Sequence, residues 1–82
     1  MRFTVTWIDS ATEELARIWL DARNKRAVRA AADQIERILR HAPDQAGVEF
    51  CGRLLVVVRP LVVTYSVRKD DLLVEVAQVW HV

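Results

Sequence analysis

The chain has 82 residues, of which 52% are hydrophobic and 28% are charged, and its 12 basic and 11 acidic residues leave a net charge of +1. This length fits one domain, residues 1–82, and the high apolar content excludes a disordered chain. A nearly balanced charge gives no general attraction to nucleic acid or to a membrane surface, so any basic site must come from local clustering.

The cellular location is read from three features. The single cysteine, Cys51, cannot form an internal disulfide, so nothing indicates an oxidising compartment. Residues 1–7 alternate in polarity and lack the apolar core of a signal peptide. The longest apolar run, residues 54–58, is far too short to span a bilayer. We therefore expect a cytoplasmic protein with no membrane segment.

The first elements are a strand and a helix. Residues 3–8 alternate between core-type and polar or β-branched side chains, which is typical of a strand. Ser10 and Glu13 have the spacing of a capping box, which predicts that the helix begins at Ser10. An apolar stripe follows at helical spacing and comprises Ala11, Leu15, Ile18, Trp19 and Ala22.

A second helix follows a short polar break at residues 21–24, with Asn24 as its expected N-cap. Its apolar face comprises Val28, Ala31, Ala32, Ile35, Ile38 and Leu39. Ala31 and Ala32 are small enough to let the first helix pack closely. Because so few residues join them, the two helices should run antiparallel as a hairpin. A basic stripe on the second helix (Arg26, Arg29, Arg37 and Arg40) is interpreted as a solvated face.

The rest of the chain predicts three antiparallel strands at residues 53–59, 61–68 and 71–81. Two-residue turns at 59–60 and 69–70 would place Val58 opposite Leu61 and Tyr65 opposite Val74. With this register, one face is apolar except at Gln78. The core face comprises Leu54, Val56, Val58, Leu61, Val63, Tyr65, Val67, Leu72, Val74, Val76 and Trp80. We expect the helices to cover it, and all three tryptophans to serve packing.

The opposite face of the sheet should be open, because two helices can cover only one side. Its apolar centre comprises Leu55, Val57, Val62, Ala77 and Val79. Exposed patches of this kind usually mark a binding surface for a partner. Two alternatives stay open: the register is shifted by one residue in a strand, or the loop with Val48 and Phe50 folds over the patch.

This order of elements resembles the RelE/ParE superfamily of bacterial toxins over nearly the whole chain. The residues that carry the resemblance are 3–7, 10, 11, 15, 52–57, 60–63, 65–67, 70, 71, 74–76 and 79–81. The resemblance implies a two-layer α+β fold: an N-terminal strand, an antiparallel helical hairpin and a three-stranded antiparallel meander.

The resemblance also implies a function as the toxin of a type II toxin–antitoxin system, neutralised by a cognate antitoxin. Ribonucleases of this family cleave messenger RNA on the ribosome, whereas other members poison DNA gyrase. The RNA's own 2′-hydroxyl is the nucleophile, so neither a metal nor a cofactor is expected. The alternative from another class is a non-catalytic interaction module that forms a homodimer through the open face.

A metal-free ribonuclease site would comprise Arg53, Arg59, Glu75 and His81. The arginines would bind the scissile phosphate, Glu75 would act as a general base, and His81 would transfer a proton. Each has an ordinary alternative as a surface or turn charge, and His81 as a solvated residue near the chain end. Val62 stands where ribonuclease members often carry an arginine, so the site is incomplete by the family's pattern.

Overall fold

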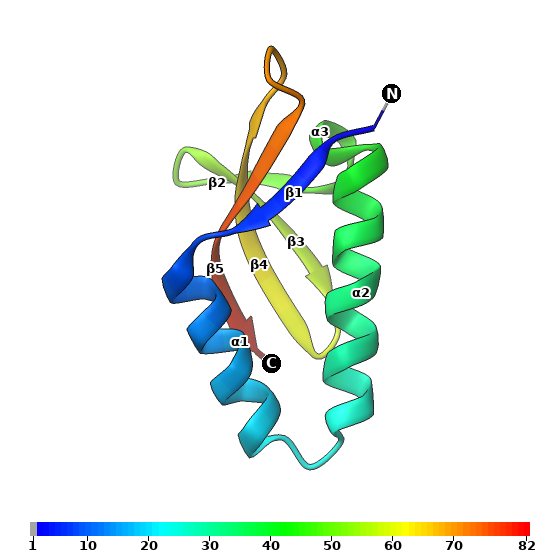
Figure 1. The fold of residues 1–82 in the computed structure, drawn as a ribbon, viewed down its shortest axis with the longest axis vertical. Coiled ribbons are helices and arrows are strands. Elements are labelled where there is room, and N and C mark those ends of the chain that lie inside the picture. Colours follow the sequence, from blue (N-terminus) through cyan, green and yellow to red (C-terminus); the bar gives the residue numbers. More distant parts are fainter. Residues whose placement is uncertain (1) are drawn as a thin grey trace.

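The computed structural model describes residues 2–82, which form two long helices on one side of a five-stranded sheet and a short third helix (Figure 1). The elements in chain order are β1 (Thr4–Trp7), α1 (Asp9–Asp21), α2 (Lys25–His41), α3 (Pro43–Ala46), β2 (Val48–Phe50), β3 (Arg53–Val58), β4 (Leu61–Arg68) and β5 (Leu73–His81). The strand order is β1-β5-β4-β3-β2, with β1 parallel to β5 and the other pairs antiparallel. The predicted α+β class and meander are confirmed.

The helix starts were only partly predicted. Helix α1 begins at Asp9, and its N-cap, Ile8, makes no side-chain capping bond, so the prediction that Ser10 caps the helix is wrong. The reason is that the Ile8 amide still donates to Val76 O of β5 (3.0 Å), while Ile8 O already accepts from the Thr12 amide. The strand therefore passes directly into the helix. Asn24 caps α2 as predicted, because its Oδ1 accepts from the Ala27 amide at 3.0 Å.

The two helices lie on the same side of the sheet but do not close against each other along their length. Helix α1 runs along β5, and α2 runs past β1 and β3 (Figure 1). Ala31 is buried as expected, but Ala32 lines an open groove between the helices. Within residues 2–82, no helix is long and apolar enough to cross a membrane.

The first hairpin has the predicted register. Val58 pairs with Leu61 and Leu54 with Tyr65, because a two-residue turn joins β3 to β4. Tyr65, from the middle of β4, is fully buried, and its hydroxyl donates to Pro43 O at 2.6 Å. This hydrogen bond attaches the short helix α3 to the sheet.

The second hairpin departs from the prediction in two places. A four-residue turn, residues 69–72, replaces the expected two-residue turn, and Leu72 within it has φ of 50°. Tyr65 therefore pairs with Val76 instead of Val74. Farther along, Thr64 pairs with Gln78, so Ala77 is an extra residue in a β-bulge. One extra residue exchanges the two faces of every position that follows it.

The bulge corrects the predicted faces of Val79 and Trp80 and determines the face of His81. Val79 was expected on the open face, but it pairs with Val63 and is only 3% exposed in the core. Trp80 was expected in the core, but it pairs with Val62 and is 40% exposed on the open face. His81 pairs with Leu61 and so belongs to the helix side of the sheet.

An additional strand, β2, lies where a loop was expected. Val48 pairs with Leu55 and Phe50 with Arg53, so β2 extends the sheet at its edge. Both apolar side chains of β2 are exposed. The alternative in which this segment folds over the open face is therefore wrong.

Candidate functional site

The open face of the sheet, which lies opposite the helices, carries an apolar patch. The residues Leu55, Val57 and Val62 lie there as predicted, and the register adds three more members, Val48, Phe50 and Trp80. Val48 is 67% exposed and Val57 is 51% exposed. We use the name apolar patch for these six residues. Ala77 lies at the bulge beside them.

Arg53 and Glu75 lie on the open face beside the apolar patch. Leu54 pairs with Tyr65, which places Arg53 beside Ser66, and Ser66 pairs with Glu75. The backbones of Arg53 and Glu75 are thus two strands apart, about 10 Å at the usual strand spacing. Within residues 2–82, neither side chain forms an ion pair. These two residues could meet one substrate group from opposite sides.

Arg59 and His81 lie elsewhere, so the predicted four-residue site is not assembled on one face. His81 pairs with Leu61, and the Val82 amide donates to Pro60 O at 2.8 Å, which holds the end of β5 against the β3–β4 turn. Arg59 and His81 line the same hollow, with a volume of about 550 Å³, between that turn and the α1–α2 turn. We call it the inter-turn cavity. A smaller hollow of about 160 Å³ beside α1 is also lined by His81.

The inter-turn cavity has residues that sequence reasoning did not select. Arg23 and Asn24 line it from the α1–α2 turn, together with Asp21 at the end of α1. Lys25 fixes this turn, because its Nζ donates to Leu20 O at 3.0 Å and to Ala22 O at 3.1 Å. In the sequence, Arg23 and Asn24 belong to the polar break at residues 21–24, which indicated the end of one helix and the N-cap of the next but no binding site.

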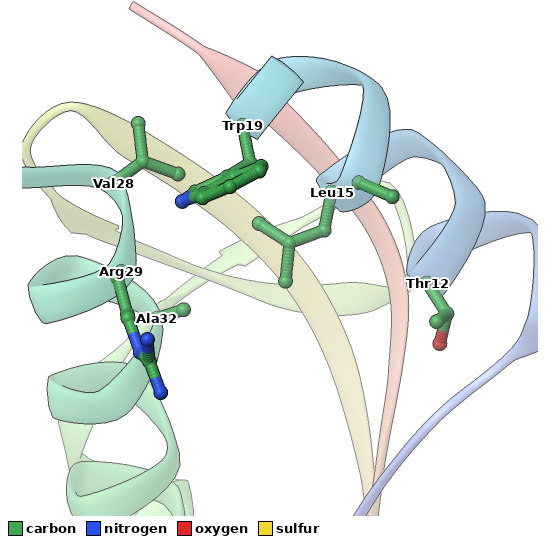
Figure 2. Close-up of a pocket in the computed structure, with 7 residues that line it drawn as sticks. Thr12, Leu15, Trp19, Val28, Arg29 and Ala32 are labelled. Atoms are coloured by element: carbon green, nitrogen blue, oxygen red, sulfur yellow. The ribbon is translucent and has the colours of Figure 1, made fainter. Parts of the chain in front are cut away.

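A third candidate surface is the groove between α1 and α2, with a volume of about 360 Å³. Figure 2 shows Leu15 and Trp19 of α1 projecting toward Val28 and Ala32 of α2, with Arg29 at the rim. Trp19 is 39% exposed, and Lys25 Nζ lies 5.4 Å from the centre of its ring, a cation–π distance. The expectation that Trp19 is a packed core residue is therefore only half met.

Within residues 2–82, the two side chains with a shifted pKa are Tyr65 and Asp44, which lie around α3, away from these surfaces. Burial raises the pKa of Tyr65, and the nearby Asp44 carboxylate adds to the effect, while the Gly47 amide opposes it. The hydrogen bond from Lys69 lowers the pKa of Asp44, which is exposed. Among residues 2–82, no three His, Cys, Asp or Glu side chains are grouped to hold a metal ion.

Comparison with known proteins identifies the fold. No protein-family model and no curated protein sequence matches the chain. Among solved structures, it matches a chain of the toxin–antitoxin complex RelBE2 from Mycobacterium tuberculosis with a TM-score of 0.83, covering 100% of both chains at 16% identity. The chain has a RelE-like fold. This confirms the fold that the sequence resemblance implied. Because the sequence identity is only 16%, this similarity establishes the fold alone. The function therefore has to be inferred from the surfaces of the protein.

Proposed function

We propose that this protein is the toxin-like component of a toxin–antitoxin pair and that an antitoxin partner neutralises it. The observation that carries the proposal is the full-length match, at a TM-score of 0.83, to a chain from a toxin–antitoxin complex. The structural alignment covers both chains completely, so neither chain has an additional domain relative to the other.

Two apolar surfaces support a protein partner. The apolar patch exposes Val48, Val57 and Trp80 on a face that no helix within residues 2–82 covers. The groove between α1 and α2 exposes part of Trp19 beside aliphatic side chains. A small soluble domain rarely leaves such surfaces free, and an aromatic residue in each supplies the kind of anchor that dominates binding energy.

The mode of action in this proposal is either an incomplete ribonuclease site or a gyrase-type target. Arg53 and Glu75 share the open face, which supports weak RNA chemistry there. Arg59 and His81 line a cavity on the other side, which weighs against a complete four-residue site. An RNA-cleavage assay with ribosomes and a gyrase supercoiling assay would separate the two modes. Arg53→Ala should abolish only the first.

The toxin role is tested by controlled expression in bacteria. We expect growth arrest on induction and relief when a small neighbouring reading frame is co-expressed. Val57→Asp should keep the fold, because Val57 is half exposed, but should weaken capture of the antitoxin. Leu20→Asp is the matched control, since Leu20 is 65% exposed on α1 and outside both surfaces. Normal growth with folded protein present would overturn the toxin proposal.

The second candidate is a non-catalytic module that forms a homodimer through the apolar patch. The exposure of Trp80 and Val57 on an uncovered sheet face favours it. In this case light scattering should show a dimer that Val57→Asp converts to a monomer while Leu20→Asp does not. A monomer at all concentrations, with no partner bound, would exclude the module.

A further inference from the structure

The inter-turn cavity combines positive charge with an apolar floor. Residues 21–30 hold four basic side chains and one acidic side chain, a net charge of +3 in a chain whose total is +1. Two of the arginines of this end, Arg23 and Arg59, line the cavity with His81. Within residues 2–82, neither arginine forms an ion pair. The cavity lining therefore carries two positive charges, those of Arg23 and Arg59, and one negative charge, that of Asp21.

Both walls of the cavity are held in place by hydrogen bonds. The Val82 amide bonds to Pro60 O, which fixes His81 and the β3–β4 turn relative to each other. On the other wall, Lys25 Nζ bonds to two carbonyls at the end of α1 and so fixes the α1–α2 turn that carries Arg23. These bonds hold in place the two turns that carry Arg23 and Arg59 on either side of the cavity.

The volume of the cavity and its apolar lining residues indicate which class of ligand it could bind. Its volume of about 550 Å³ is within the range of sites for small ligands. Ala22, Ala27 and Pro60 supply apolar contact surface. Arginine guanidinium groups bind phosphate through paired N–H donors, and the N-terminal end of α2 adds a positive dipole beside them.

We propose that the inter-turn cavity binds a nucleoside phosphate, with Arg23, Arg59 and His81 around the phosphate and the nucleoside on the apolar floor. The ligand can come from two sources, a free nucleotide or the terminal nucleotide of an RNA strand. This site is distinct from the apolar patch on the other face of the sheet. The test of this site does not depend on growth arrest, so its outcome is independent of the proposed toxin role.

The test is an NMR titration of the full chain with adenosine 5′-monophosphate, adenosine, and a short RNA with or without a 5′-phosphate. We expect the phosphorylated probes to shift amide signals of residues 21–27, 59–61 and 81–82 in a saturable way, and adenosine to leave them unchanged. Shifts with the monophosphate identify a free nucleotide as a ligand. Shifts with the phosphorylated RNA alone identify a strand terminus.

Variants make the test specific. Arg23→Ala and Arg59→Ala should each weaken binding about tenfold, as for the loss of a charged hydrogen bond. Arg37→Ala is the matched control, because Arg37 is an exposed arginine of α2 outside the cavity. Asp21→Asn should tighten binding severalfold, a gain that misfolding cannot produce. No saturable shift with either phosphorylated probe, or equal affinities for Arg59→Ala and Arg37→Ala, would overturn the site.

Discussion

The assignment of faces at the end of β5 decides which residues can form a functional surface, and a matched pair of valine variants tests it. Val79 is 3% exposed and Val57 is 51% exposed. Val79→Ala removes two methyl groups from the core, worth about 1.6 kcal/mol at about 0.8 kcal/mol per buried CH₂, and the cavity left behind raises the cost to about 2–3 kcal/mol. Val57→Ala makes the same chemical change at a half-exposed site and should cost about 0.5 kcal/mol.

The measurement is urea unfolding followed by circular dichroism. For a domain of this size, the urea midpoint should fall by about 1.5 M for Val79→Ala and by only about a few tenths of 1 M for Val57→Ala. The dependence of the unfolding free energy on urea concentration, the m-value, should be unchanged in both variants. Equal shifts for the two variants would refute the bulge-shifted register. A larger shift for Val57→Ala would place Val57 in the core and the apolar patch inside the protein.

Other predictions concern the attachment of α3 to the sheet. Tyr65→Phe should cost about 1–2 kcal/mol in chemical unfolding, because it leaves Pro43 O without its buried donor. Burial raises the pKa of Tyr65 above 10.0, so the unfolded chain loses this proton first, and stability should fall as pH rises from 10.0 toward the folded pKa; Tyr65→Phe should remove that dependence. Gly47→Ala should destabilise by about 1–3 kcal/mol, since a Cβ there would lie 2.6 Å from the Tyr65 hydroxyl, and a thermal melt matching the wild type would contradict this. The hydrogen bond from Lys69 lowers the pKa of Asp44 below 3.8, so the part of stability that Asp44 provides should be lost as pH falls below 3.8, and Asp44→Asn should lack that acid-dependent loss.

Most of the fold could be predicted because local rules specify it. The N-terminal strand, the Asn24 cap and the β3–β4 register all follow from patterns within a few residues. A two-residue turn leaves no freedom in the register of the strands it joins. The parallel pairing of β1 with β5 joins residues far apart in the chain, such as Thr4 and Leu73, and no local pattern encodes it.

The candidate site was harder to predict, because one bulged residue reverses a face. The alternation along β5 continues through Ala77, so the pattern gives no direct sign of the extra residue. The only warning was Gln78, a polar residue in an otherwise apolar predicted core face. In the structure Gln78 lies on the open face, where its Oε1 accepts from the Thr64 hydroxyl at 3.2 Å. A polar residue that interrupts a core face is therefore evidence for a bulge just before it.

The bulge also changes what the open face can do. It moves His81, a titratable group, to the helix side and brings Trp80 to the open face beside Val62. The open face thus lacks His81, a candidate for proton transfer, and carries the aromatic side chain of Trp80. This composition favours binding of a partner over catalysis. His81 joins Arg59 at the inter-turn cavity instead, where basic groups and an apolar floor suit an anionic ligand. Because consecutive residues of β5 serve opposite faces, a partner on Trp80 would leave His81 and its cavity accessible from the other side of the sheet.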